Sequence, residues 1–151
     1  MKKMILFLIP LLLLAGISYA ERAKQREVIS SPNAPAAIGP FSQAIRVGNM
    51  LFISGQLGIS PKTGKFAEGG FDAQARQALE NHKAILTAAG FSLNDVVQCQ
   101  VFVTDMNNYS RFNAIYKEYF TKDFPARAVL EVSRIPADGL VEIMMTAVKN
   151  E

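Results

Sequence analysis

The sequence has no tryptophan, one cysteine and one histidine, and these shortages exclude several kinds of site. With Cys99 alone, the chain cannot form an intramolecular disulfide framework. Cys99 alternates with glutamines in a β-like run, which favours a small buried side chain over a catalytic thiol. His82 has no second histidine with which to form a metal site or a catalytic triad, so we interpret it as a packed or interface residue.

The chain also lacks a cluster or stripe of lysine and arginine. Its formal net charge of +3 depends partly on Lys2 and Lys3. Without these two, 14 of the 16 basic side chains remain against 13 acidic ones, so the net charge falls to +1. A nearly neutral domain without a basic patch argues against a nucleic-acid partner.

The first 20 residues have the pattern of a secretory signal peptide. Two lysines precede an apolar run from Met4 to Ala15, and Ser18 and Ala20 supply the small residues of a cleavage site. A retained membrane anchor would need about 20 apolar residues, and Pro10 interrupts this shorter run. We predict cleavage after Ala20, export to the periplasm or the medium, and no stable membrane anchor. The rest, residues 21–151, is expected to form a single domain.

Turn residues and hydrophobic periodicity predict the elements of that domain. A short strand is expected near 28–29, and the β-like runs 42–47 and 51–54 flank a Gly-Asn pair typical of a hairpin. Over 71–89 the apolar period changes to about 3.6, which predicts a helix that stops at Gly90. One stripe of this helix is expected to be buried: Ala75, Ala78, Leu79, His82, Ile85, Leu86 and Ala89.

The second half is predicted to contain a strand over 96–104, a second helix to about residue 120, and strands over 126–134 and 140–149. Asp105 or Asn107 would cap the helix. We interpret its aromatic stripe as core rather than as a base-stacking platform. The order β-β-β-α-β-α-β-β predicts an α+β or α/β sandwich, in which a mixed sheet carries both helices on one face.

Two charged residues lie in the last two strands, where apolar side chains would be safer. Arg127 follows Pro125, and its guanidinium offers a planar fork that suits a carboxylate. Glu142 lies in a run that is apolar on both faces, which predicts a central strand covered on both sides. Partial desolvation would raise its pKa toward the range useful for acid-base catalysis. The alternatives are a surface arginine paired with an acid and a strand-end glutamate that reaches water.

These two residues would not meet if the last two strands formed a simple hairpin. A hairpin centred on Ala137 would place Arg127 and Glu142 roughly 16 Å apart along the strands and on opposite faces. A shared site therefore requires another strand arrangement or a second subunit.

Several motifs resemble those of the reactive intermediate deaminase family (Rid, YjgF-like, also described as endoribonuclease L-PSP). The resemblance extends from about residue 28 to 148. The motifs are Pro-Ala-Arg at 125–127, Ile135, Val-Glu-Ile at 141–143, and the stretches 34–44, 54–56, 77–81 and 88–90.

The resemblance implies a chorismate-mutase-like α+β fold whose last strand inserts between earlier ones. It also implies a homotrimer with three sites in the clefts between subunits. The implied reaction is hydrolysis of enamines and imines, such as 2-aminoacrylate and related 2-imino acids, to 2-keto acids and ammonia. No metal or organic cofactor is implied, and the expected partners are a small imino or keto acid and further copies of the chain.

The resemblance further implies roles for single residues. Arg127 would bind the substrate carboxylate, and Glu142 would position a water and transfer protons during attack on the imine carbon. Phe41 stands where the family often has tyrosine, Val129 where it often has cysteine, and His82 where it usually has an aliphatic residue. The implied substrate-binding residues are Phe41, Ser54, Gly55, Asn113, Arg127 and Val129.

Two other functions remain open at this point. The missing hydroxyl at Phe41 and the predicted export favour a non-catalytic trimeric binding protein for small carboxylates such as 2-keto acids. Some relatives are attributed ribonuclease or translation-inhibitor activity, which predicts strongly salt-dependent RNA binding. The nearly neutral charge argues against this last function.

Overall fold

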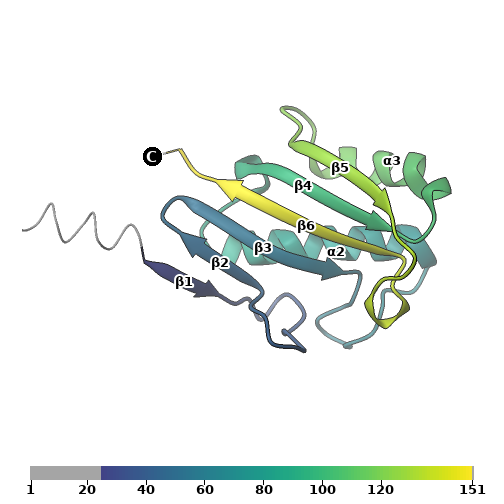
Figure 1. Ribbon diagram of the computed structural model, residues 1–151, viewed down its shortest axis with the longest axis horizontal. Helices are drawn as coiled ribbons and strands as arrows, with labels where there is room; N and C mark the ends of the chain where they lie inside the picture. The colour runs from purple at the N-terminus through teal and green to yellow at the C-terminus, as the bar shows by residue number, and fades with distance from the viewer. Residues whose placement is uncertain (1–24, 151) are drawn as a thin grey trace, which may run out of the picture.

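The structure is a computed structural model that describes residues 25–150, so the predicted signal peptide lies outside the described residues. The described chain forms six strands and two α-helices in the predicted order (Figure 1). The fold is α+β, as expected. The elements are β1 (Arg26–Ile29), β2 (Ala44–Val47), β3 (Met50–Leu57), α2 (Gly70–Ala88), β4 (Val96–Val103), α3 (Tyr109–Tyr119), β5 (Ala126–Glu131) and β6 (Val141–Val148).

The last strand, β6, lies in the middle of the sheet rather than beside β5. The strand order is β1-β2-β3-β6-β4-β5, and β6 is antiparallel to both of its neighbours, β3 and β4 (Figure 1). The edge strand β5 pairs with β4 in parallel. The simple hairpin of the last two strands is therefore wrong, and the insertion of the last strand between earlier ones is confirmed.

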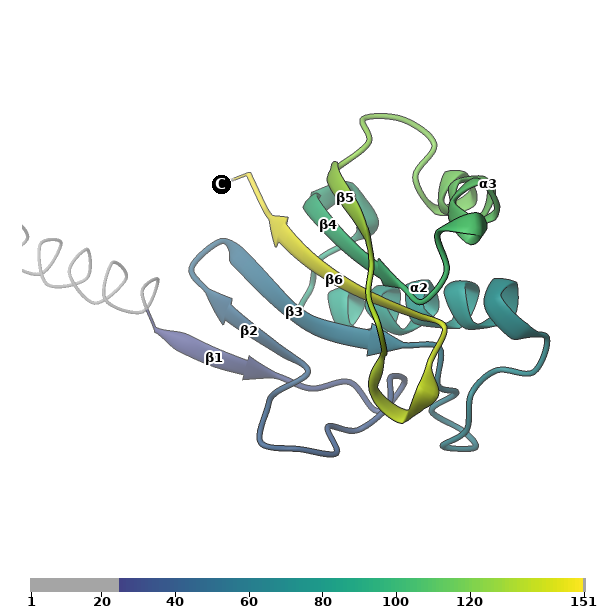
Figure 2. The same cartoon turned by 45° about the vertical axis from the view of Figure 1, so that its right-hand side comes forward.

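Both helices cover the same face of the sheet (Figure 2). The crossovers β3-α2-β4 and β4-α3-β5 connect parallel strands and move in the same direction across the sheet. Because such crossovers are almost always right-handed, both helices must fall on one side. The predicted stripe of α2, from Ala75 to Ala89, is buried against that side, and the helix ends before Gly90 at a φ of 75°.

The face of the sheet opposite the helices, here called the open face, is apolar but uncovered in a single chain. Phe52, Leu130 and Met144 are 44%, 46% and 39% exposed there. The expectation that Glu142 lies in a strand covered on both sides is therefore wrong for one chain, although β6 is central. The apolar residues on both faces of β6 therefore do not reflect helices on both sides, because both crossover helices cover the same face.

A short polar segment leads into α3. Asp105 accepts a hydrogen bond from the backbone N–H of Asn107 at 2.9 Å, and so caps a 3₁₀ turn over Met106–Asn108. The α-helix itself begins at Tyr109, directly after this turn. Asp105 is thus the residue that starts the helical segment, as one of the two sequence alternatives proposed.

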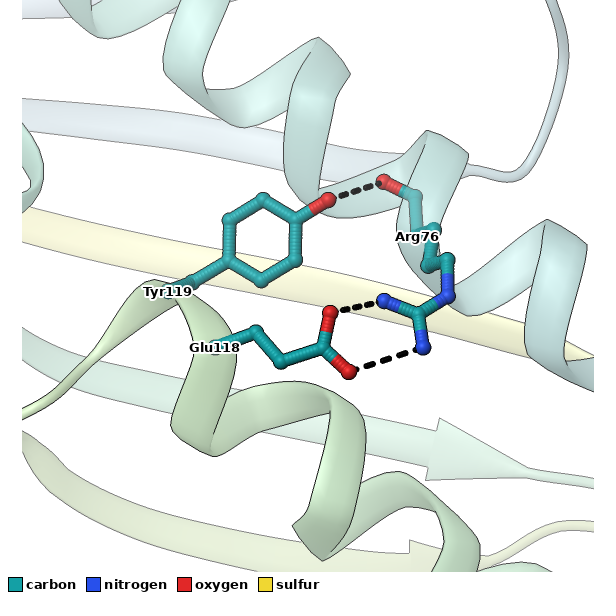
Figure 3. Close-up of polar contacts among 3 residues, drawn as sticks. All are labelled: Arg76, Glu118 and Tyr119. Atoms are coloured by element: carbon teal, nitrogen blue, oxygen red, sulfur yellow. Dashed lines mark hydrogen bonds and ion pairs between the residues drawn. The ribbon is translucent and has the colours of Figure 1, made fainter.

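Surface ion pairs tie α3 to α2. Arg76 donates to both carboxylate oxygens of Glu118, one of them at 2.8 Å, and the Tyr119 hydroxyl donates to the Arg76 carbonyl at 3.4 Å (Figure 3). Arg111 pairs with Asp72 at 3.0 Å. Exposed ion pairs contribute little to stability. Their geometric effect is to fix the orientation of α3 relative to α2.

None of the helices within residues 25–150 is long and apolar enough to cross a membrane.

Candidate active site

Arg127 is the second residue of β5 and is half-buried on the helix side of the sheet. Its Nη2 donates to the Asn113 side-chain oxygen on α3 at 2.5 Å. Its guanidinium carbon lies 4.6 Å from the centre of the Tyr116 ring and 5.6 Å from that of Phe112. No carboxylate within residues 25–150 lies at ion-pair distance, so Arg127 is not the acid-paired surface arginine considered above. The remaining N–H groups can bind a carboxylate.

A pocket of about 420 Å³ opens beside this guanidinium. The aromatic stripe of α3 was expected to be core, and Phe112 and Tyr116 are buried as predicted. The spacing of the residues did not indicate that these rings also pack against Arg127. The one available signal was Asn113, an expected site residue on the same helix. The pocket is lined by Asn113, Tyr116, Lys117, Phe124, Pro125 and Arg127.

Cys99 lies directly beside Arg127 in the parallel pairing of β4 with β5. The thiol is fully buried, and this burial raises its pKa to about 12. A thiol with such a pKa is not a thiolate at neutral pH, which agrees with the sequence interpretation of a small buried side chain. Val129 lies on the same face as Arg127 and packs against the core, opposite Val101.

Glu142 is the second residue of β6 and is half-buried on the open face. It pairs with Leu57 of β3 on one side and with Phe102 of β4 on the other. Burial between these strands raises the pKa of the carboxyl above its usual value, as predicted. The raised pKa makes the carboxylate a better proton acceptor than an ordinary glutamate.

A bulge in β3 makes room for this carboxyl. The register with β6 shifts between Ile53 and Gln56, which places Ser54 and Gly55 opposite Met144. A Cβ on Gly55 would lie only 1.9 Å from a carboxylate oxygen of Glu142. The absent side chain of Gly55 thus lets the carboxyl lie against the backbone of β3.

The loop that carries Phe41 is joined to the same bulge. The Ser54 hydroxyl donates to the carbonyl of Ser42 at 2.7 Å, and the backbone N–H of Ser54 donates to the carbonyl of Gln43 at 3.0 Å. Phe41 itself is 48% exposed. The expected site residues therefore form two groups, with Arg127, Asn113 and Val129 in one and Phe41, Ser54, Gly55 and Glu142 in the other.

Replacing Gly55 with alanine is expected to displace the Glu142 carboxyl from β3 toward water. Because burial is what raises this pKa, it should fall toward its ordinary value. A ¹³C NMR titration of the glutamate side-chain carboxyls measures the change. Gly39→Ala is the matched control, since a Cβ there would meet only the Phe41 ring. An unchanged pKa in the Gly55→Ala variant would contradict the contact.

The two groups lie on opposite faces of the sheet. Arg127 pairs with Cys99 of β4, which pairs in turn with Met145 of β6. Glu142 lies three residues before Met145 in β6. With strands about 4.8 Å apart and about 3.3 Å per residue, the two Cα atoms are roughly 14 Å apart. An odd offset also turns the side chains to opposite faces. Within one chain, Arg127 and Glu142 do not meet.

Comparison with known proteins identifies the family. The model of the Endoribonuclease L-PSP family matches residues 31–149. A RutC family protein of Pyrococcus horikoshii is 54% identical over 124 residues, which are 82% of this chain and 98% of the relative. The 2-iminobutanoate/2-iminopropanoate deaminase of Salmonella typhimurium is 48% identical over 126 residues, with 82% and 98% covered. The crystal structure of the YjgF gene product of E. coli superposes with a TM-score of 0.79 at 46% identity, covering 82% and 99%. The chain therefore belongs to the Endoribonuclease L-PSP family, the Rid (YjgF-like) family that its motifs resemble.

Proposed function

We propose that this protein hydrolyses 2-imino acids and their enamine tautomers, such as 2-aminoacrylate, to 2-keto acids and ammonia. The observation that carries the proposal is the Arg127 guanidinium, which lies at a pocket with one amide partner and no carboxylate partner among the described residues. A substrate carboxylate would accept charge-assisted hydrogen bonds from the other N–H groups of Arg127. Relatives named 2-iminobutanoate/2-iminopropanoate deaminase, at 47–48% identity, support the same chemistry.

In the proposed reaction, Arg127 binds the carboxylate and so fixes the adjacent imine carbon. Glu142 accepts a proton from a water as the water oxygen bonds to that carbon, and the imine nitrogen takes a proton from solvent as its C=N double bond becomes a single bond. Glu142 then gives its proton to the nitrogen of the resulting carbinolamine, the C–N bond breaks to release ammonia, and the hydroxyl loses its proton to solvent as the 2-keto acid forms. A carboxyl with a raised pKa suits both proton transfers.

We propose that the site lies between subunits of a homotrimer. The opposite orientations of Arg127 and Glu142 support this arrangement, because only a second copy can bring the two groups together. The apolar open face supports it as well, since large uncovered apolar surfaces are typical of interfaces. A cyclic trimer repeats one such contact three times, so every site would be equivalent. The mass in solution tests the trimer, and a monomer at working concentration would contradict it.

The predicted signal peptide remains a proposal about where the enzyme acts. We propose cleavage after Ala20 and export. The match to the family begins at residue 31, and the P. horikoshii relative is covered over 98% of its length by 82% of this chain, so residues 1–20 are additional to the shared domain. Mass spectrometry of protein from the periplasm or the medium should find a chain that starts at Glu21. An uncleaved, cytosolic chain would contradict export.

The activity is tested with an amino-acid oxidase that generates 2-imino acids from amino acids. Adding the purified protein should accelerate 2-keto acid formation above the rate of spontaneous hydrolysis. No acceleration would contradict the proposed deaminase activity.

Phe41 favours one second candidate, the non-catalytic binding of 2-keto acids. It brings an exposed ring without a hydroxyl to the Glu142 side of the site. Arg127-dependent binding of a 2-keto acid in calorimetry, without imine turnover, would favour this candidate. RNA cleavage, suggested by the family's description, has less support: the only histidine, His82, is fully buried.

A further inference from the structure

One face of α2 carries three buried polar side chains among its apolar ones. Gln74 is 7% exposed, and Asn81 and His82 are fully buried. Burying a polar group is unfavourable unless the group is hydrogen-bonded, so each of the three side chains is expected to have a hydrogen-bond partner. Their backbone partners lie in or directly next to β6, which carries Glu142, and β3, which pairs with it.

Two of the three side chains hold β6 on either side of Glu142. The Gln74 side-chain oxygen accepts a hydrogen bond from the backbone N–H of Leu140 at 2.9 Å. His82 Nε2 donates to the carbonyl oxygen of Ile143 at 2.7 Å. One contact lies two residues before Glu142 and the other lies one residue after it.

The third side chain holds β3, the strand against which the Glu142 carboxyl lies. The Asn81 amide donates to the carbonyls of Leu57 at 3.0 Å and Ile59 at 2.9 Å. Leu57 is the residue of β3 that pairs with Glu142. The helix approaches this closely because Gly58 has no side chain, and a Cβ there would lie 2.4 Å from the Cα of Gln74.

The His82 imidazole has a hydrogen-bond partner for only one of its two ring nitrogens. Its Nδ1 is buried and has no hydrogen-bond partner. An apolar side chain of similar volume would remove this unpaired nitrogen, but it would also take away the donor to the buried Ile143 carbonyl. What the imidazole adds is a directed bond to the backbone of β6.

We infer that His82, together with Gln74 and Asn81, positions Glu142 by fixing the backbone of β6 and β3 on both sides of the carboxyl. The inference rests on the proposed deaminase function. His82 is fully buried between α2 and the sheet, whereas Glu142 faces the open side, so His82 does not touch the substrate. It acts through the Ile143 carbonyl and is a positioning residue rather than a catalytic one.

The test compares His82→Leu with His82→Gln in hydrolysis of 2-imino acids. Leucine removes the donor, whereas the glutamine amide can restore it. Since misplacement of a catalytic group by 1 Å can cost up to 100-fold, we expect His82→Leu to lower kcat by about 10-fold. KM should change less than about twofold, because Arg127 still binds the carboxylate. His82→Gln should regain most of the lost kcat. Thr87→Val, an exposed change on the same helix, is the control.

The outcomes separate this inference from the proposed function. Turnover by the wild type with an unchanged kcat in His82→Leu would overturn the positioning role and leave the deaminase function intact. Equal losses in the leucine and glutamine variants would also overturn it. No turnover by the wild type would overturn both. If His82→Leu does not fold, Gln74→Met removes the contact to Leu140 and should show the same decrease in kcat at an unchanged KM; an unchanged kcat there overturns the inference.

Discussion

Replacing Glu142 with glutamine is expected to lower kcat for 2-imino acid hydrolysis by about 1000-fold, the typical contribution of a positioned acid-base group. Glutamine keeps the shape of the side chain but cannot accept a proton from water. KM should change little, because the substitution leaves Arg127, the proposed carboxylate clamp, intact. Steady-state kinetics of the variant, with the exposed Glu68→Gln as control, measure the effect. Retention of wild-type kcat would contradict the role of Glu142.

The same substitution should not reduce stability at neutral pH. Burial without a cationic partner among the described residues raises the pKa of Glu142 in the folded state. A group whose pKa is raised by folding makes the folded state more stable at low pH, where it is protonated, than at neutral pH. This extra stability is lost as the pH rises through the folded-state pKa. Glu142→Gln should therefore melt at the wild-type temperature or above it at neutral pH, and the difference should vanish in acid. A lower melting temperature of Glu142→Gln than of the wild type at neutral pH would contradict the claim that the Glu142 carboxylate is buried without a compensating partner.

Replacing Arg127 with alanine is expected to lower kcat/KM by about 100-fold, mainly through KM. Two charge-assisted hydrogen bonds to a carboxylate are lost, each worth about 1.5 kcal/mol or more. Lysine at this position keeps the charge but not the planar fork, so Arg127→Lys should be intermediate. Arg111→Ala, which removes an exposed arginine paired with Asp72, is the matched control. Equal acceleration of keto-acid formation by wild type and Arg127→Ala would contradict the proposed clamp.

The local elements of this fold follow from the sequence because they depend on neighbouring residues. Apolar spacing predicted α2 with its buried stripe, and Gly48-Asn49 gave the two-residue turn between β2 and β3. The position of β6 between β3 and β4 depends instead on contacts distant along the chain, about which periodicity carries no information. For that reason spacing alone led to a hairpin, and only the family resemblance predicted the inserted strand.

The site was predictable in part. Two charges in strands led to Arg127 and Glu142, and burial does raise the pKa of Glu142. Two contacts had no sequence signal that spacing could detect. The rings of Phe112 and Tyr116 pack on the Arg127 guanidinium, and the Glu142 carboxyl occupies the space left by Gly55. Both depend on the meeting of segments that are far apart in the chain.

The central claim is that Arg127 and Glu142 act together from different subunits, and mixing two inactive variants tests it most directly. Arg127→Ala and Glu142→Gln subunits are unfolded together in equal amounts, refolded and assayed with 2-imino acids at concentrations below KM, where both variants are nearly inactive. In a randomly mixed cyclic trimer, about one quarter of the sites would combine an intact arginine of one subunit with an intact glutamate of its neighbour. We therefore predict recovery of roughly a quarter of wild-type activity from two nearly inactive parents. A mixture no more active than its parents, when wild type refolds to full activity in parallel, would contradict the shared site.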